Sequence, residues 1–359
     1  MEILLWGAGQ DGVKLSKLYR YYPNIYNDDI VGVVDSNSQK WGEVLFGKEI
    51  MNPASIASSK WDKIVIASTI YGAAIRKLLI DDYKIPSDYI LSFQDYRYGK
   101  VIHYQYDTNL KKNEAHGKCD TYRPFNKRSL VVYTAIIGDY DDLRDPLIVE
   151  PGVSYVCYTD QKHIKSDVWD IRYIDEVPEE KRAICVREYK MLPHKFFPEY
   201  ESSIWVDASI KIVGKLTELI EKYQRYANFL LMPHCDGICA YDQIFSYVVY
   251  LFTQKSIAIK QLTKYLNEQY PEDNGLMMGG FLVRNHNDSK IIRTMEDWYH
   301  EVCFYSSRDQ ISLPYVVWKN NLIYDLCDLY IAKNSWISWG GHKHIKDTRG
   351  ADKLIRGKS

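Results

Sequence analysis

The stretch Ser203-Ile204-Trp205-Val206-Asp207-Ala208-Ser209 is an apolar run that ends in an acid and a hydroxyl residue. Such a run, rich in β-branched and aromatic residues, is typical of a buried strand. Similar runs at residues 130–137 and 154–159 precede it, and helical patterns alternate with them. This alternation predicts an α/β domain with a mixed, mainly parallel sheet, whose ligands gather at the carboxyl ends of the strands.

The composition describes an ordinary globular protein. The chain has 359 residues, of which 46% are hydrophobic and 26% charged, so it is long enough for two domains. Its formal net charge of −1 gives no argument for nucleic-acid binding. Seven scattered cysteines, the lack of a secretory leader and the absence of an apolar run of about 18 residues predict a cytoplasmic protein without a transmembrane segment.

The first 97 residues predict a small Rossmann-like domain. A strand at residues 3–6 leads into a glycine-rich turn with Gly7, Gly9 and Gly12, and the next strand ends in Asp35. In nucleotide-binding domains such glycines allow close approach of phosphate, and the acid binds ribose hydroxyls. The segment resembles the small Rossmann-like domains attached to bacterial surface-polysaccharide enzymes. It therefore either binds a nucleotide or serves as a docking module that has lost its ligand.

The remaining boundaries follow from composition. Residues 98–128 are polar and contain Pro124, which predicts an irregular linker. Residues 129–345 form the second domain, and residues 346–359 a basic tail. Anionic lipid is an alternative partner for this tail, which would place the protein peripherally at the inner face of the membrane.

Three polar residues of the second domain, Thr134, Asp160 and Asp207, fall at or near predicted strand ends. Carboxylates at this edge suit hard cations, and a departing diphosphate needs its developing charge neutralised. These positions therefore favour binding of a nucleotide sugar. The alternative for Asp160 is a turn or cap after the strand.

Five ordered blocks carry a resemblance to a known family. They are residues 133–141, 158–160 and 190–194, Ser203-Ile204-Trp205-Val206-Asp207, and Arg308-Asp309-Gln310-Ile311-Ser312. Over residues 129–345 the chain resembles the glycosyltransferase-like domain shared by plant mucilage-biosynthesis proteins and bacterial polysaccharide clusters. The resemblance implies a GT-A-type fold and, more distantly, similarity to the retaining galactosyltransferase and glycogenin group.

The resemblance also implies residue roles. Asp309 would contact the donor sugar or acceptor, with Arg308 beside it, although Asp309 could instead cap a helix. The donor would be bound by Thr134, Ala135, Asp160, Arg187, Lys190, Asp207, Ser209, Gly279 and Gly280. The residues themselves give candidate acceptor contacts: Tyr241 and Asp242 on a loop near His234, and Trp339, whose ring can stack on a sugar face.

Metal dependence is left open by the sequence. Related transferases place Asp-x-Asp where this chain has Asp207-Ala208-Ser209, so one carboxylate ligand for Mn²⁺ or Mg²⁺ is missing. Asp207 and His342 are the candidate ligands, and Lys211 could partly replace the cation. A zinc site at His234, Cys235 and Cys239 is a minor alternative, because no second paired element accompanies them.

These observations predict a glycosyltransferase that extends a bacterial surface glycan, such as capsule or O-antigen, from a nucleotide-sugar donor. Its acceptor would be a glycan or glycolipid, and its first domain could dock a partner. One alternative is a non-catalytic nucleotide-sugar-binding protein with a decayed transferase site. Another is an oxidoreductase or epimerase that works through the N-terminal glycine loop, although no Tyr-x-x-x-Lys pair follows that loop.

Overall fold

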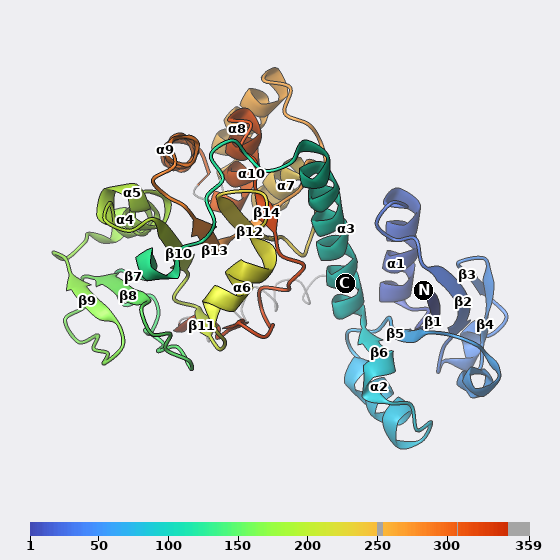
Figure 1. Ribbon diagram of the computed structural model, residues 1–359. Helices are drawn as coiled ribbons and strands as arrows, with labels where there is room; N and C mark the ends of the chain where they lie inside the picture. The colour runs from blue at the N-terminus through green and yellow to red at the C-terminus, as the bar shows by residue number, and fades with distance from the viewer. Residues whose placement is uncertain (250–253, 307, 344–359) are drawn as a thin grey trace. The chain divides into compact units, whose positions relative to one another are not determined.

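The structure, a computed structural model, describes residues 1–249, 254–306 and 308–343 (Figure 1). The chain forms two compact units that divide between Tyr104 and Gln105. The predicted basic tail, residues 346–359, lies outside the described residues. Among the described helices, none combines the length and hydropathy that a membrane-spanning segment requires.

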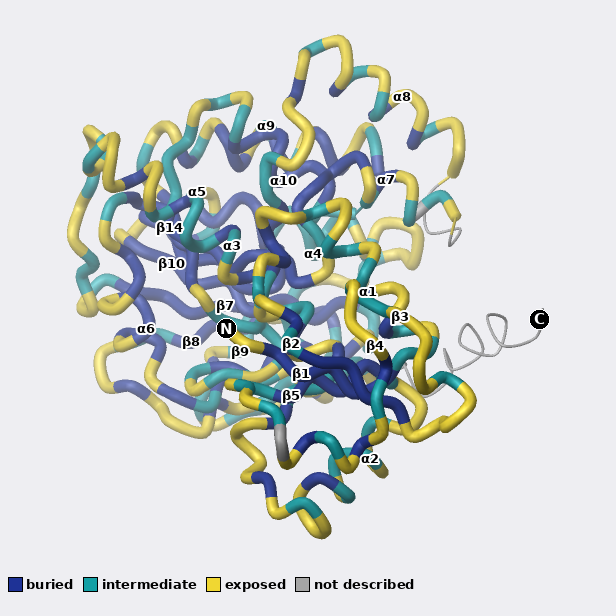
Figure 2. Tube along the Cα trace, turned by 90° about the vertical axis from the view of Figure 1, so that its right-hand side faces the viewer, coloured by how far each residue is buried: buried dark blue, intermediate teal, exposed yellow. Residues whose placement is uncertain are grey.

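The first unit contains a six-stranded sheet in the order β3-β4-β2-β1-β5-β6. Its strands are β1 (Glu2–Trp6), β2 (Asp29–Val34), β3 (Val44–Leu45), β4 (Lys48–Met51), β5 (Lys63–Ile66) and β6 (Ile90–Ser92). All its pairs are parallel except β3 with β4. Helices α1 (Gln10–Tyr21) and α2 (Gly72–Asp81) connect the strands. The predicted Rossmann-like arrangement is confirmed, and Figure 2 shows the buried central strands in dark blue.

The glycine turn of this unit depends on close packing. A Cβ atom on Gly12 would lie 2.3 Å from the carbonyl oxygen of Gly7, so α1 could not approach the turn with a larger residue there. Gly7 has a φ of +120°, a conformation that favours glycine. Gly9, in contrast, faces only the Lys40 ammonium at 3.7 Å from its Cβ position.

The predicted irregular linker is wrong over its first part, because helix α3 spans Phe93–His116. Gln105, Asn109 and Asn113, spaced four residues apart on one face of this helix, are buried. Asn113 donates to the carbonyl oxygen of Tyr324 at 2.9 Å and to Asp325 at 3.1 Å. Gln105 donates to the carbonyl oxygen of His234 at 2.8 Å and accepts from the Leu276 amide at 2.7 Å. A buried face made of amides has no apolar periodicity, which is why it resembles a linker in sequence.

The second unit is built on a seven-stranded sheet in the order β14-β12-β13-β10-β7-β8-β9. The strands are β7 (Leu130–Ile136), β8 (Ser154–Thr159), β9 (Asp170–Tyr173), β10 (Ser202–Val206), β12 (Phe229–Pro233), β13 (Met277–Arg284) and β14 (Asp325–Leu326). Only β13 runs antiparallel to both its neighbours, β10 and β12. The predicted mixed, mainly parallel sheet is therefore confirmed.

Helices cover both faces of this sheet (Figure 1). Along β7, Val131 and Tyr133 join the core under α4 (Glu179–Met191), α7 (Ala240–Val249), α8 (Lys255–Asn267), α9 (Ser289–Phe304) and α10 (Asp309–Lys319). Leu130 and Val132 join the opposite core, with α6 (Leu216–Tyr223). This alternation follows from the two-residue period of a strand. The short helix α5 (Pro193–Phe196) and a small sheet of β11 (Ile210–Ile212) with β15 (Ile337–Trp339) complete the unit.

The antiparallel strand β13 decides where the site forms. Val206, the last residue of β10, pairs with Phe281 in the middle of β13. Because the two strands run in opposite directions, Gly279 and Gly280 lie beside the residue that follows β10, which is Asp207. The amide of Asp207 donates to the carbonyl oxygen of Gly280 at 2.9 Å.

Candidate active site

A buried lysine joins two aspartates at the carboxyl edge of β10. The Lys190 ammonium, in the last turn of α4, forms an ion pair with Asp309 and lies 3.7 Å from Asp207 Oδ1. The Lys190 side chain is only 6% exposed, whereas that of Asp207 is 37% exposed. The cluster therefore has a buried end at Lys190 and Asp309 and an open end at Asp207.

Two tryptophans hold the aspartates in place. Trp205 Nε1 donates to Asp207 Oδ1 at 2.6 Å, and Trp298 Nε1 donates to the main-chain oxygen of Asp309 at 3.0 Å. The Lys190 ammonium lies 6.0 Å from the Trp205 ring centre and 5.8 Å from that of Trp298. Aromatic faces stabilise a nearby cation, so both rings support the ammonium as well as the aspartates.

The glycine pair of β13 forms the wall of the cluster. A Cβ atom on Gly279 would lie 2.9 Å from Asp309 Oδ2 and 3.0 Å from Lys190 Nζ, and one on Gly280 would lie 3.0 Å from Asp207 Oδ2. Neither glycine has a positive φ, so the need for glycine here is steric. The five residues Lys190, Asp207, Gly279, Gly280 and Asp309, predicted separately from sequence, are thus neighbours.

Asp309 is the first residue of α10, and Arg308 occupies the N-cap position, so the prediction that Asp309 caps the helix is wrong. Burial alone would raise the pKa of Asp309. The positive charges of Lys190 and Arg187, with hydrogen bonds from Lys190 and the Gln310 amide, hold that pKa below its usual value instead. Asp309 is therefore a carboxylate throughout the neutral range.

A second group of residues lies at the open end, and most of it is not evident from sequence. Asp141 accepts from the His342 ring at 2.8 Å and from the Lys343 amide at 3.0 Å. The Arg144 guanidinium donates to the carbonyl oxygens of Ala208 and of Gly341, the latter at 2.9 Å. These bonds attach residues 340–343 to the loop that follows Asp207. The resemblance block at residues 133–141 includes Asp141, but nothing in the sequence singled out Arg144.

Two exposed aromatic rings lie near His342. Its ring centre lies 5.4 Å from that of Tyr140 and 6.4 Å from that of Trp339. Tyr140 is 58% exposed and Trp339 50% exposed. The hydrogen bond to Asp141 raises the pKa of His342 against the opposing effect of burial, and the charge of Asp207 adds to that rise.

The described residues do not form a metal site by themselves. No group of three or more His, Cys, Asp or Glu side chains in the described part of the chain could hold an ion, and this includes His234, Cys235 and Cys239. Ser209, in place of a second acid, is buried, and its carbonyl oxygen accepts from the Gly340 amide at 2.7 Å. Asp207 and His342 would supply at most two ligands, so we derive no step through a bound metal.

Asp160 and Thr134, two other predicted donor residues, differ in their hydrogen bonding. Both carboxylate oxygens of Asp160 accept backbone hydrogen bonds, from the Gly138 amide at 2.8 Å and the Val177 amide at 3.2 Å. Although burial opposes it, these bonds lower the pKa of Asp160. The bonding pattern is that of the turn predicted as the alternative for this residue. Thr134 and Ala135 are buried at the end of β7, and the Thr134 hydroxyl has no hydrogen-bond partner among the described residues.

The predicted acceptor residues are not brought together. Tyr241 is buried in the core, and its hydroxyl donates to the carbonyl oxygen of Tyr270 at 2.7 Å, so the structure does not support it as a surface contact. Asp242 is exposed in the first turn of α7. Lys211 belongs to β11, and the cation that lies between the aspartates is Lys190 instead.

In the first unit, the acid predicted to bind ribose is bonded to its own chain. Asp35 Oδ2 accepts from the Ala8 amide at 2.7 Å, and Asp35 Oδ1 accepts from the Asn37 amide at 2.8 Å. Asp11, in the first turn of α1, accepts from the amide and hydroxyl of Thr69, each at 2.7 Å. Asp35 thus accepts hydrogen bonds from the glycine turn and from the chain that follows β2, and Asp11 joins α1 to the residues after β5.

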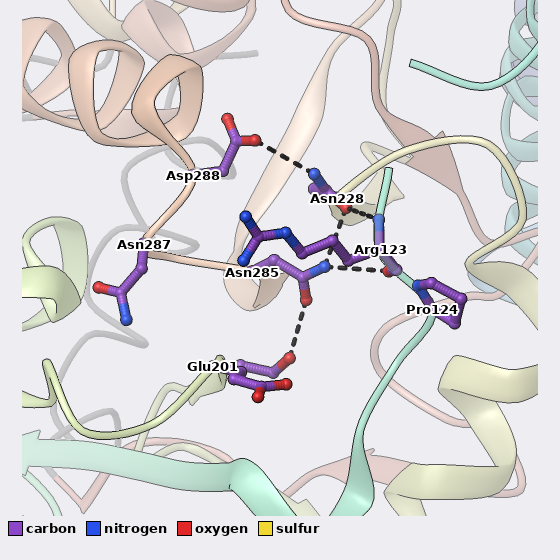
Figure 3. A pocket seen from close by; sticks show the side chains of 8 residues that line it. Arg123, Pro124, Glu201, Asn228, Asn285, Asn287 and Asp288 are labelled. Carbon is purple, nitrogen blue, oxygen red and sulfur yellow. Dashed lines mark hydrogen bonds between the residues drawn. The ribbon is translucent and has the colours of Figure 1, made fainter. Parts of the chain in front are cut away.

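A separate pocket lies at the opposite end of β10 (Figure 3). There Asn285 donates to Asn228 at 2.9 Å and to the carbonyl oxygen of Arg123 at 3.1 Å, and it accepts from Ser202 at 2.8 Å. These bonds fix the segment that enters β7 and connect it to β13. The pocket is thus lined by a hydrogen-bonded structural network, remote from Asp207 along the strand.

Comparison with known protein families identifies the second unit. Residues 116–326, more than half of the chain, match the family described as TOD1/MUCI70, glycosyltransferase-like domain. The chain belongs to the TOD1/MUCI70 glycosyltransferase-like family. Residues 1–91 match the family described as C2185-like, N-terminal. The TOD1/MUCI70 match includes Lys190, Asp207, both wall glycines and Asp309, but it ends before Trp339 and His342.

Individual relatives are distant. The chain is 21% identical over 221 residues to the probable hexosyltransferase MUCI70 of Arabidopsis thaliana, covering 53% of this chain and 37% of that protein. It therefore spans well under half the length of this curated relative. Mouse xyloside xylosyltransferase 1 in its apo form aligns over 55% of this chain and 84% of its own, with 8% identity and a TM-score of 0.33. A TM-score of 0.33 does not establish a shared fold.

Proposed function

We propose that this member of the TOD1/MUCI70 family is a glycosyltransferase that moves a hexosyl group from a nucleotide sugar to a surface glycan or glycolipid, with retention of configuration. The bond between the anomeric carbon and the diphosphate oxygen breaks, and a bond to the acceptor oxygen forms. The acceptor proton passes to the departing diphosphate. The observation that supports this most is the convergence of Lys190, Asp207 and Asp309 on the Gly279–Gly280 wall.

The charged residues of the cluster suit different parts of the donor. Asp309 is a buried carboxylate, and such a group stabilises positive charge that develops at an anomeric carbon. The wall glycines let β13 pack closely against both aspartates, because a Cβ atom on either glycine would crowd a carboxylate oxygen. Lys190 and Arg187 supply positive charge toward the diphosphate, which a transferase must stabilise as it leaves. Thr134, Ala135 and Asp160 would lie toward the base, and Arg308 toward the diphosphate or Asp309.

The exposed aromatic rings suit the acceptor. Trp339 pairs with Ile210, just after Asp207, and both Trp339 and Tyr140 are exposed rings near His342. Such rings combine apolar area with a polar edge and are well suited to sugar rings. Asp242 is retained only as a more distant acceptor contact.

The test is donor hydrolysis and binding by the purified protein. A thermal-shift screen of UDP-, GDP- and CMP-sugars, with Mn²⁺ or with chelator, identifies the base by ligand-induced stabilisation. We expect one nucleotide class to raise the melting temperature and its sugar to be hydrolysed slowly. Asp309→Ala and Asp207→Ala should each reduce that turnover by about a hundredfold or more, as loss of a group that stabilises the transition state does.

The chelator arm decides the role of a metal. Asp207 and His342 remain the candidate ligands, completed by diphosphate oxygens and water. Turnover that requires Mn²⁺ and fails in His342→Ala would support this pair. Stabilisation without turnover, with a broad panel of acceptors, would instead favour the non-catalytic binding protein.

A further inference from the structure

Arg284, the last residue of β13, is completely buried. Within the described ranges no carboxylate lies at ion-pair distance from its guanidinium, and its Nε has no hydrogen-bond partner there. Burial lowers its pKa. Removing a charge from water without an opposite charge costs several kcal/mol, so an apolar residue would be more favourable unless the cation is needed.

The guanidinium is bonded instead to neutral groups around Lys190. Nη1 donates to the main-chain oxygen of Lys190 at 2.8 Å, and Nη2 donates to the Tyr133 hydroxyl at 2.5 Å. The Tyr133 hydroxyl donates in turn to the same Lys190 oxygen at 3.1 Å. Two donors therefore converge on one carbonyl group.

That carbonyl lies in the last turn of α4, which ends at Met191. The last four carbonyls of a helix lack partners within the helix and carry its partial negative charge. A cation at this end is stabilising by about 0.3–2 kcal/mol. Arg284 thus acts as a buried partner for the carboxyl end of α4, which accounts for a charge in the core.

The same strand also forms the wall of the site. β13 pairs with β10 on one side and β12 on the other, so its backbone is fixed. At its beginning Gly279 abuts Asp309 and the Lys190 ammonium, and at its end Arg284 fixes the Lys190 main chain. Both ends of Lys190 are therefore positioned by β13.

We infer that Arg284 is a positioning residue, which together with Tyr133 fixes the carboxyl end of α4 so that the Lys190 ammonium stays between Asp207 and Asp309. The catalytic consequence rests on the proposed function, whereas the structural part does not. Arg284 does not touch the substrate in this proposal. It acts only through Lys190.

The experiment uses the full-length chain with Arg284→Met and Arg284→Lys. Tyr133→Phe removes one converging donor while keeping the ring, and it serves if Arg284→Met fails to fold. Phe197→Leu is the matched control, because Phe197 is buried against Tyr133 with ring centres 4.9 Å apart but has no bond to the Lys190 oxygen. The cavity left by Phe197→Leu lowers stability but keeps the hydrogen bonds to the Lys190 carbonyl oxygen.

The first readout needs no activity. Reductive methylation with formaldehyde, mapped by peptide mass spectrometry, reports the access of reagent to Lys190 relative to exposed Lys111 in the same sample. We expect Arg284→Met to speed the labelling of Lys190 by about tenfold, which corresponds to a local opening easier by about 1.4 kcal/mol. Phe197→Leu should change it by less than about twofold. Equal labelling in Arg284→Met and wild type overturns the inference.

The second readout compares two quantities: kcat with the best donor from the screen, and the rise in melting temperature that UDP or GDP causes. Arg284→Met should lower kcat by about a hundredfold, the effect of a displacement of about 1 Å, and leave stabilisation by the nucleoside diphosphate unchanged. Arg284→Lys should recover part of the loss. If kcat falls only in proportion to the melting temperature, and falls equally in Phe197→Leu, Arg284 has no positioning role. If the wild type turns over no donor, the proposed function fails, while the labelling still decides whether Arg284 positions Lys190.

Discussion

At Lys190 a single ammonium lies within ion-pair distance of two carboxylates, and its burial makes both contacts energetically important. Removing one partner of a buried pair costs about 3–5 kcal/mol, because the other charge remains without compensation. Asp207 was predictable from sequence as a strand-end carboxylate, and Lys190 and Asp309 from the blocks that carry the family resemblance. Their mutual contact was not, since it depends on the direction of β13.

His286 gives a prediction for the pH dependence of stability. It is completely buried, its Nε2 bonds to the carbonyl oxygen of Phe197 at 2.8 Å, and its Nδ1 has no partner in the described part of the chain. Burial lowers the pKa of His286 to about 4 from 6.5. Between these values the unfolded chain binds a proton that the folded chain does not, so stability falls as the pH falls.

From pH 7 to pH 5 this residue alone should reduce the free energy of unfolding by about 2 kcal/mol. Urea unfolding at both pH values measures the change. In His286→Gln the difference between the two should shrink by that amount, whereas in His300→Gln, an exposed histidine, it should not. An unchanged difference in His286→Gln would mean that folding does not shift the pKa of this histidine, which contradicts the prediction.

At the scale of elements, the strands were predictable because buried parallel strands are continuous apolar runs. Residues 130–137 and 203–206 needed no other signal. Helix α3 was not predictable, because the face formed by Gln105, Asn109 and Asn113 is buried through hydrogen bonds. Apolar periodicity, the main signal for a helix, does not register such a face.

The amide face of α3 gives a stability prediction. Asn113→Ala removes the side-chain donor to Oδ1 of buried Asp325 and leaves the Tyr324 carbonyl oxygen with Asn109 as its remaining side-chain donor, at 3.1 Å, which should cost about 1–3 kcal/mol of unfolding free energy. Lys111→Ala, on the exposed side of the same helix, should change it by less than about 0.5 kcal/mol. Denaturant unfolding compares the two. Equal stabilities would show that the helix contributes little to the second unit.

The wall of β13 gives an activity prediction. Gly279→Ala places a methyl group 2.9 Å from Asp309 Oδ2, so the Lys190–Asp309 pair must move. We expect turnover to fall by about tenfold to a hundredfold with little loss of melting temperature. Gly99→Ala, where a Cβ atom meets nothing within 4 Å, is the control and should stabilise its helix by about 0.5–1 kcal/mol. Full activity in Gly279→Ala argues that the pair does not contact the donor.

At the scale of the whole molecule, the two units make different use of similar strand ends. In the second unit the strand-end carboxylate Asp207 is open to solvent, whereas in the first unit both oxygens of Asp35 accept from the chain. The glycine pattern predicted the turn of the first unit correctly. The pattern could not indicate that Asp35 accepts a hydrogen bond from the Ala8 amide, because this bond depends on how the folded turn orients that amide.

We therefore predict that the full-length protein shows no saturable binding of NAD⁺ or NADP⁺ by calorimetry. Gly9→Val should leave donor turnover within about twofold of wild type, since only the Lys40 ammonium lies near the Gly9 Cβ position and the first unit supplies no catalytic group. Saturable dinucleotide binding that Gly9→Val abolishes would restore the oxidoreductase or epimerase hypothesis.

The bonds that Arg144 and Asp141 make to residues 340–343 have a practical consequence for cloning. The family match ends at residue 326, so an expression plasmid designed from the match alone would end the chain there. A chain truncated there would lack His342 and Trp339. The loop after Asp207 would also lose the hydrogen bonds that connect it, directly and through Arg144, to residues 340–343. Such a shortened protein could fold around an intact sheet and show no turnover for that reason alone, so activity should be measured on the full-length chain.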